Sequence, residues 1–568
     1  MRASVAKTSS RAPVMSTPKH NAAIWYASDG YDPDNKGING RRVAGASFLK
    51  GFAAHGRVEE FVSLSENHRG AKAFEAQMRA LGVSQPIRGA SFFNARKIAP
   101  VDVLYYPAPN YASELWRRQS LGSTAYSICG ITHTTATTAV MQGAVDLRLA
   151  PQMPWDAVIC TSKAVLASQE AQQDMVDEYL RTRFGNTPPR PVMPVIPLGI
   201  TPKDYAHDPE ARTRLRNRMS LGEKDIVIST LSRLTPFGKF DPFPLFMAME
   251  DASQKLPKGL KLHFVACGIY TDEYSRKIFQ DGAAKLMPNV SFTHLDGASA
   301  EARIEAFSGA DIFTFPIDNI QETFGLAPLE AMAAGLPQIT TDWDGMRDTV
   351  SEDVGIRVPT RSLPAGHGAI DAWGYLTKRL SYAQYSNNIS AMTEVDLPAL
   401  TEAIVTLASD PIKRKAMGAA GLKRVKEQFS WKAIIPQYQD LWGELSSIRA
   451  HAETGVTTLH LHPNPTAPSP MRLFQSYPSA LLPKGIAACV ATGRTPELEE
   501  MFSLRQYDRL KQPFEKQTTL RRILDCITEA GARGTVATDV AKTLSFNPMT
   551  VERCYAWLLK YGYIARVG

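Results

Sequence analysis

The sequence predicts an α/β protein with two Rossmann-like domains that face a cleft, followed by a small helical module. From residue 22 onwards, short apolar runs alternate with longer amphipathic stretches, which is typical of βα units and a parallel sheet. A chain of 568 residues is too long for one hydrophobic core. After residue 450 the composition changes to a Pro-, Thr- and His-rich linker, which indicates a separate C-terminal part.

Residues 1–20 contain four Lys and Arg, no acidic residue, and no apolar core of a secretory signal. We interpret them as a disordered tail, with an organelle transit segment as the alternative. Residues 21–200 form the first predicted Rossmann-like domain. Its first strand, loop and helix are AAIWYAS, DPDNKGING and RRVAGASFLKGFAAHG, its later strands are VDVLYYP, STAYSICGITH and DAVICTS, and PVIPLGI closes it as a strand and turn.

Residues 201–450 form the second predicted Rossmann-like domain. The stretch 360–397 is rich in Gly, Tyr and Ser and is interpreted as a long loop or lid. The segment after residue 411 predicts one or two amphipathic helices with many Lys and Arg. The predicted strands are DIVISTLSRL, LKLHFVACG, VSFTHLDG, ADIFTFPI and LPQITTDWDG.

Residues 451–475 are the predicted linker, and residues 476–568 a helical region that ends in a winged-helix-like module. Residues 515–568 carry eight Lys and Arg against five Asp and Glu. The helix that would read DNA starts Met549-Thr550-Val551-Glu552-Arg553, and one Arg beside one Glu is a poor set for phosphates or base edges. Protein docking or self-association through 515–568 is therefore favoured over nucleic-acid binding.

Composition narrows the class of protein without deciding its activity. Hydrophobic residues make up 44% and charged residues 21%, as in a soluble globular protein. The net charge of +8 suits phosphate-bearing small molecules, an anionic membrane surface or nucleic acid alike. The six cysteines are scattered without C-x-x-C spacing, and no apolar run approaches the roughly 20 residues needed to span a bilayer. We therefore expect a cytoplasmic protein without a transmembrane segment.

The strongest functional signal is QETFGLAPLEAMAAGLP, residues 321–337. ETFG would be the turn after the strand ADIFTFPI, and LAPLEAMAAG the helix that it opens. The free N–H groups and positive dipole end of a helix start bind a diphosphate, and Gly325 permits close approach of the backbone. Glu330, about two turns into the helix, can accept paired hydrogen bonds from ribose hydroxyls. Glu322 lies in the turn, with seven residues between it and Glu330.

Other polar residues follow strands of both predicted domains. Arg233 and Lys239 follow a strand of the second domain, where two cations can neutralise a diphosphate as it leaves. His133 follows a strand of the first domain in CGITHTTAT. Gly37 and Gly40 belong to a loop that would approach the phosphates from the other side of the cleft.

These motifs, together with VIPLGI, NVSFTHLDG, TDWDGMRDTV and EQFSW, resemble the family 4 retaining glycosyltransferases, whose E-x7-E motif reads much like ETFGLAPLE. The resemblance covers residues 22 to about 445. It implies the GT-B fold, with a nucleotide-sugar donor between two Rossmann-like domains and no metal or other cofactor. Residues 21–200 would then be the acceptor domain and residues 201–450 the donor domain. The interval from Arg233 to Lys239 is one residue longer than is usual in that family.

The resemblance also implies a role for each site residue. Arg233 and Lys239 would hold the phosphates, Phe324, Gly325 and Leu326 would line them with backbone N–H groups, and Gly40 would approach them from across the cleft. Glu322 would bind the hydroxyls of the donor sugar, Glu330 the ribose, and His133 the sugar from the opposite domain. The acceptor hydroxyl would attack from the face that the diphosphate leaves, so the protein stabilises the leaving group and positions the reactants.

Two metal-like patterns are set aside. Asp342-Trp343-Asp344 is formally a D-x-D, but it follows a strand where the resembled family needs no metal. His460-Leu461-His462 lies in the linker without other ligand types nearby.

Several alternatives stay open. The chain could be an inactive GT-B scaffold, or a nucleic-acid-binding regulator that acts through its C-terminal module. The donor base, the donor sugar and the acceptor are unmarked. The basic stretch KRKAMGAAGLKRVK is either a membrane-contacting surface or, as we favour, a solvated helix face.

Overall fold

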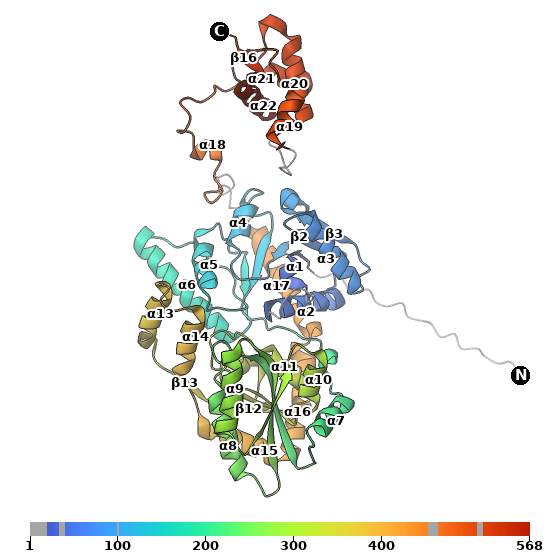
Figure 1. Ribbon diagram of the computed structural model, residues 1–568, viewed down its shortest axis with the longest axis vertical. Helices are drawn as coiled ribbons and strands as arrows, with labels where there is room; N and C mark the ends of the chain where they lie inside the picture. Colours follow the sequence, from blue (N-terminus) through green and yellow to red (C-terminus); the bar gives the residue numbers. More distant parts are fainter. Residues whose placement is uncertain (1–19, 33–39, 99–100, 453–463, 508–514, 568) are drawn as a thin grey trace, which may run out of the picture. The chain divides into compact units, whose positions relative to one another are not determined.

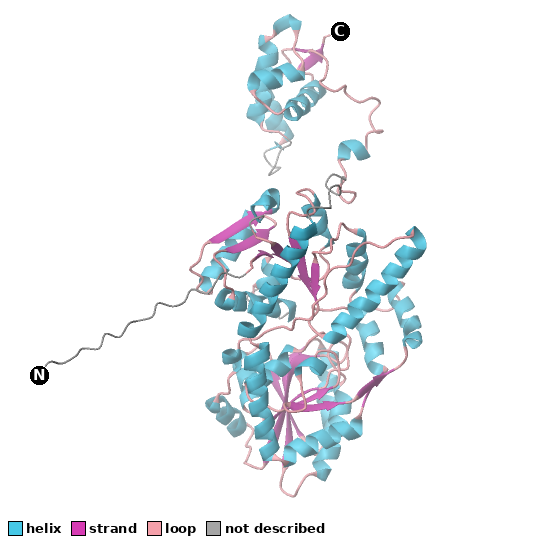
Figure 2. Cartoon of the chain, turned by 180° about the vertical axis from the view of Figure 1, so that it is seen from behind, coloured by secondary structure: helices cyan, strands magenta, loops and turns pink. Residues whose placement is uncertain are grey.

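The computed structural model describes residues 20–32, 40–98, 101–452, 464–507 and 515–567 (Figure 1). It divides into two compact units, Met1–His462 and Pro463–Gly568. The larger unit contains two six-stranded parallel sheets, each covered by helices, as Figure 2 shows. This is the GT-B architecture that the sequence predicts.

The first sheet has the strand order β3-β2-β1-β4-β5-β6, and every neighbouring pair is parallel. All of its strands except the edge strand β3 are almost entirely buried, as expected for a sheet covered on both faces. They are β1 (Ala22–Trp25), β2 (Phe61–Ser65), β3 (Ile87–Ser91), β4 (Val103–Tyr105), β5 (Ser127–Ile131) and β6 (Ala157–Ile159). The helices of this domain are α1 (Ser28–Tyr31), α2 (Gly40–His55), α3 (His68–Ala80), α4 (Ala112–Gln119), α5 (Thr138–Leu149) and α6 (Lys163–Phe184), with a 3-10 segment at Phe92–Ile98.

The predicted closing strand PVIPLGI is replaced by isolated bridges. Val192 pairs with Ala157 and Val195 with Cys160, both beside β6. Pro194 and Pro197 lack the N–H that a continuous ladder requires, which explains the difference.

The second sheet has the order β12-β11-β10-β7-β8-β9 and is also parallel. In Figure 1, α8 and α9 lie on one side of this sheet and α7 and α10 on the other. Its strands are β7 (Asp225–Leu234), β8 (Lys261–Tyr270), β9 (Ser291–Asp296), β10 (Ile312–Phe315), β11 (Gln338–Thr341) and β12 (Gly355–Val358). Its helices are α7 (Pro209–Arg218), α8 (Pro242–Lys255), α9 (Glu273–Leu286), α10 (Ala300–Ser308), α11 (Leu326–Ala333), α12 (Met346–Thr349), α15 (Leu397–Ser409) and α16 (Pro411–Arg424), with a 3-10 turn at Pro202–Tyr205.

The stretch predicted as a long loop is structured. Strands β13 (Thr360–Ser362) and β14 (Thr393–Val395) pair antiparallel, and between them lie α13 (Ala369–Leu376) and α14 (Tyr382–Ala391). Ser381 and Gln384 form a capping box at the start of α14. The loop prediction was therefore wrong, because this cap and contacts with the first domain outweigh the low helix propensity of Gly, Tyr and Ser.

The last helix of the larger unit returns to the first domain. Helix α17 (Trp431–Ala452) follows a π-turn at Val425–Phe429, and the indole N–H of Trp431 donates to Ser47 Oγ at 2.8 Å. At the crossing, Ile200 N donates to Phe429 O at 2.9 Å and Trp431 N donates to Ile200 O at 3.1 Å. The two segments that connect the domains are thus hydrogen-bonded to each other.

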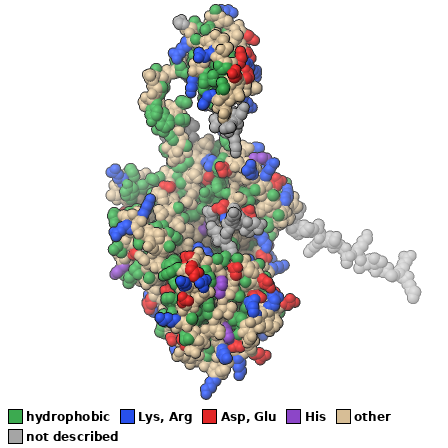
Figure 3. All heavy atoms as spheres, in the orientation of Figure 1, with side chains coloured by type: hydrophobic (Ala, Val, Ile, Leu, Met, Phe, Trp, Pro, Cys, Tyr) green, Lys and Arg blue, Asp and Glu red, His purple; other side chains and the backbone are tan. Residues whose placement is uncertain are grey.

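The basic stretch forms α16 and the turn after it. Arg414 donates to the carbonyls of Leu407 and Ala408, and Arg424 to those of Thr349 and Asp348. On the face shown in Figure 3, Lys and Arg are interspersed with Asp and Glu. None of the helices in the described parts of the chain has the length and apolarity to cross a bilayer.

The smaller unit has its own core, which includes Leu520, Ile523, Val551, Tyr555 and Leu558. Its helices are α18 (Pro470–Leu473), α19 (Leu498–Arg505), α20 (Gln517–Glu529), α21 (Ala537–Leu544) and α22 (Pro548–Tyr561). Strands β15 (Cys489–Ala491) and β16 (Ile564–Arg566) pair antiparallel. The predicted order of helices and terminal strand is present, whereas the winged-helix assignment stays a prediction.

Candidate active site

The E-x7-E motif spans the end of the turn after β10 and the first five residues of α11, as predicted. The carboxylate Oε1 of Glu322 accepts hydrogen bonds from the backbone N–H of Gly325 at 3.0 Å and of Thr323 at 3.3 Å. Gly325 caps the helix with φ of +83°, and a Cβ there would lie 2.9 Å from Met346 Sδ. Only glycine fits this backbone without strain, so the motif's Gly has a structural reason.

Lys239 and Glu322 form an ion pair at the centre of the site. Lys239 Nζ lies 2.5 Å from Glu322 Oε2, and the two side chains are 19% and 13% exposed. Burial alone would raise the pKa of Glu322, but the Lys239 ammonium and the backbone N–H bonds outweigh it and lower the pKa. Glu322 is therefore held as a carboxylate.

Arg233 reaches the same turn from the end of β7. Its Nη2 donates to Gln321 Oε1 at 3.1 Å. The structure thus brings both predicted phosphate-binding cations to residues 321–322, beside the N-terminus of α11. Two cations and a helix start in one place are suited to a diphosphate.

Glu330 is the fifth residue of α11, about one turn from the helix start and closer than the two turns predicted. Burial raises its pKa to about 7, against the opposing effects of a hydrogen bond with Tyr205 and of the Arg303 charge. Tyr205 lies in the 3-10 turn Pro202–Tyr205, just after the segment at Ile200 that connects the first domain to the second. Sequence reasoning missed this tyrosine because no local pattern connects it to Glu330.

His133 lies beside the E-x7-E turn. Its backbone carbonyl accepts from Thr323 Oγ1 at 3.2 Å, and Thr161 Oγ1 donates to Thr323 O at 3.2 Å. The ends of β5 and β6 therefore contact the turn that carries Glu322. Of the predicted glycine loop, residues 33–39, with Gly37, lie outside the described residues, and Gly40 begins α2.

The loop after β11 makes a second contact between the domains. Ser162 Oγ donates to Asp344 Oδ1 at 2.8 Å, and the N–H of Lys163 donates to Asp348 Oδ2 at 2.8 Å. Asp344 has a positive φ of 41°, which is uncommon outside glycine. Burial raises its pKa to about 7, and the nearby charges of Glu322 and Asp348 add to the rise.

The two acids of the D-x-D pattern have separate partners. Asp342 Oδ1 lies 3.2 Å from Arg357 Nε, whereas Asp344 bonds Ser162. Within the described ranges, no three or more His, Cys, Asp or Glu side chains are grouped so that they could hold a metal ion. The residues His460 and His462 lie outside those ranges.

The helical insertion contacts the loop that follows His133. Tyr375 Oη accepts from the backbone N–H of Thr138 at 3.0 Å, at the start of α5. Burial raises the pKa of Tyr382, and the opposing effects come from Ser386 of the same helix, from Thr134 and from the Arg233 charge. The insertion thus brings tyrosines to the edge of the site, a contribution that the motif did not indicate.

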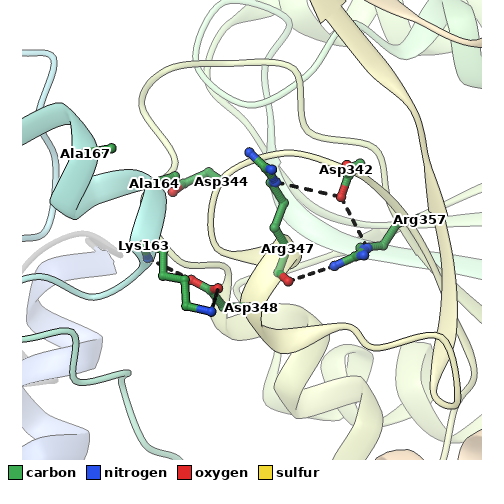
Figure 4. A pocket seen from close by; sticks show the side chains of 8 residues that line it. All are labelled: Lys163, Ala164, Ala167, Asp342, Asp344, Arg347, Asp348 and Arg357. Carbon is green, nitrogen blue, oxygen red and sulfur yellow. Dashed lines mark hydrogen bonds and ion pairs between the residues drawn. The ribbon is translucent and has the colours of Figure 1, made fainter.

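A cavity of about 380 Å³ lies beside this cluster, between the start of α6 and the loop after β11 (Figure 4). Its lining includes Asp344 but none of Arg233, Lys239, Glu322 or Glu330. It is therefore a neighbour of the predicted donor site and not the site itself.

Part of the second domain matches a known protein family, and two relatives of known name align with parts of this chain. Residues 212–379 match the family model of glycosyl transferases group 1. A GDP-mannose-dependent alpha-(1-6)-phosphatidylinositol monomannoside mannosyltransferase of Mycolicibacterium smegmatis is 27% identical over 263 residues, which cover 45% of this chain and 58% of the relative. A D-inositol 3-phosphate glycosyltransferase of Geodermatophilus obscurus is 28% identical over 209 residues, 36% of this chain and 42% of that protein.

The matches therefore span little more than half of the first relative and less of the second. Among solved structures, Anabaena Alr3699/HepE in complex with UDP aligns with 74% of this chain and 99% of its own, at 13% identity and a TM-score of 0.46.

Proposed function

We propose that this chain transfers a sugar from a nucleoside-diphosphate sugar to a hydroxyl-bearing acceptor, because residues 212–379 match the family model of group 1 glycosyl transferases. The single observation that supports this best is the Lys239–Glu322 pair at the start of α11, with Arg233 on the same turn. An inactive scaffold that binds no diphosphate would not require two cations at a helix N-terminus.

In the proposed reaction, Arg233 and Lys239 bind the diphosphate, and backbone N–H groups at the start of α11 complete its surroundings. Glu322 accepts hydrogen bonds from the donor sugar, and Glu330 from the ribose. The acceptor oxygen bonds to the anomeric carbon as the bond from that carbon to the diphosphate breaks. The acceptor's proton passes to the departing phosphate oxygen on the same face, so configuration is retained and no metal is required.

We propose GDP-mannose as the first donor to test, because the mannosyltransferase relatives are GDP-mannose-dependent by name. The test is a thermal-shift and hydrolysis screen of the purified chain with GDP-mannose and with UDP-, ADP- and dTDP-sugars. We expect one donor to stabilise the protein and to release its nucleoside diphosphate slowly.

Two variants complete the screen. Glu330→Ala removes the proposed ribose contact and should lose the thermal shift. Glu178→Ala replaces an exposed glutamate of α6, away from the site, and should keep the shift. A folded protein that responds to none of the four donors would contradict the proposal and favour the inactive scaffold.

A further inference from the structure

The cavity beside the donor site is walled by both domains of the larger unit. Lys163 and Ala167 come from the start of α6, whereas Asp344 and Arg347 come from the loop after β11 and from α12 (Figure 4). Its volume of about 380 Å³ lies in the range of sites that bind small molecules. A ligand there would contact the two domains at once.

The charges around the cavity are balanced and loosely paired. Lys163 Nζ lies 3.7 Å from Asp348, and Arg347 Nε lies 4.0 Å from Asp342, both beyond hydrogen-bond distance. Their side chains are 82% and 61% exposed. These two cations therefore keep N–H groups available to a ligand.

The same balance argues against an ionic ligand. A phosphate would meet the carboxylates of Asp342 and Asp348 beside the cations, and a metal ion would meet Lys163 and Arg347. An uncharged ligand with neighbouring hydroxyls fits this mixed lining, because each hydroxyl can donate a hydrogen bond to a carboxylate and accept one from Lys or Arg. The lining thus matches a sugar or cyclitol ring.

Asp344 connects the cavity to the reacting centre. One oxygen accepts from Ser162, and Oδ2 is buried without a hydrogen-bond partner among the described residues. A buried polar atom of this kind calls for a partner that a ligand or water would supply. Ser162 follows Thr161, which bonds the turn that carries Glu322.

We propose that this cavity is the acceptor subsite and that it takes an uncharged sugar or cyclitol ring, held by Lys163, Arg347 and Asp344. The inference rests on the proposed function, since it assigns the acceptor of that reaction. Binding from both domains would bring the acceptor to the donor only when the domains are together.

The test uses the full chain with GDP present and three probes: methyl α-D-mannopyranoside, myo-inositol and inorganic phosphate. Saturation-transfer NMR titrations measure each probe, and calorimetry measures GDP on the same samples. Ala167→Trp fills the cavity from an exposed position of α6, and Ala171→Trp, one turn further and also exposed, is the matched control.

We expect at least one of the two polyols to saturate the wild-type chain and Ala171→Trp, with affinity reduced about tenfold or more by Ala167→Trp. Asp344→Asn should weaken the same polyol. Saturation by phosphate alone, or polyol binding that Ala167→Trp leaves intact, would overturn the proposal. Absence of polyol binding overturns it too, and GDP binding in that sample shows that the donor site, and with it the proposed function, still stands.

Discussion

At the scale of single residues, Lys239 and Glu322 act as one unit in which each charge sets the behaviour of the other. The Lys239 ammonium keeps the Glu322 carboxylate ionised, and the carboxylate in turn pairs with the ammonium. In the proposed reaction, the diphosphate of the donor would compete with this ion pair for Lys239, and the strength of the pair would limit nucleotide affinity.

Replacing Glu322 with Gln tests this competition. The amide Oε1 can still accept the Gly325 N–H bond, so the turn should keep its shape, while Lys239 is released for the diphosphate. We expect GDP to bind about threefold to tenfold more tightly by calorimetry, and sugar transfer to fall by about a hundredfold. Glu178→Gln on the exposed face of α6 should change neither value. Weaker GDP binding in Glu322→Gln would refute the competition.

Glu330 gives a pH-dependent prediction. Burial raises its pKa from 4.5 to about 7, so the folded protein holds a proton that the unfolded chain releases. Its contribution to stability is complete below about pH 4.5 and is lost as the pH rises to about 7. The variant Glu330→Gln lacks this titration. The pKa values of Asp318 and Asp344 are also raised, but both residues are present in the two proteins, so their effect cancels in the comparison.

The melting temperature of the wild type should therefore fall by a few degrees relative to Glu330→Gln between pH 5 and pH 7.5. Scanning calorimetry at a series of pH values measures the difference. A constant difference across this range would mean that Glu330 does not titrate as the structure implies.

At the scale of elements, the insertion between β12 and α15 is the main departure from the prediction. Gly366, Gly368 and Gly374 depress helix propensity there, and the sequence alone favours a loop. The strands β7, β8, β9, β10 and β11 were predicted from their apolar runs. The short strands β2, β3 and β12 were not, because Ser, Arg and Gly interrupt their apolar pattern.

The candidate site was predicted to the extent that it is local in sequence. Glu322, Gly325 and Glu330 follow from one motif, and Arg233 and Lys239 from one loop. The contacts of Ser162 with Asp344 and of Thr161 with Thr323 join residues far apart in the chain, with no pattern that marks either partner. Only the fold brings them together.

Tyr375 tests whether the insertion helps to hold the domains together. Tyr375→Phe removes the oxygen that accepts the Thr138 N–H, a contact worth about 0.5–1.5 kcal/mol. We expect the donor KM to rise about twofold to fivefold in steady-state assays, with little change in melting temperature. Tyr385→Phe, the stacked neighbour at 4.6 Å, is the control and should keep the wild-type KM. Equal effects of the two variants would argue against the Tyr375–Thr138 contact.

At the scale of the whole molecule, the proposed donor site and the C-terminal core belong to separate compact units. A chain that ends at residue 462 should therefore fold and bind its nucleotide with an affinity within about twofold of the full chain, as measured by calorimetry. A folded truncated protein that has lost nucleotide binding would assign the smaller unit a direct part in donor recognition.

The paired crossing at Ile200 and Phe429–Trp431 sets how the two halves of the larger unit can move. Because the two connecting segments run side by side and share hydrogen bonds, we expect them to act as a hinge. Small changes of backbone angle along this hinge would open the two domains, whereas twisting one domain against the other would break the hydrogen bonds. We expect opening to follow one axis, so that the domains separate first where Thr161 and Ser162 contact the second domain and last beside Trp431.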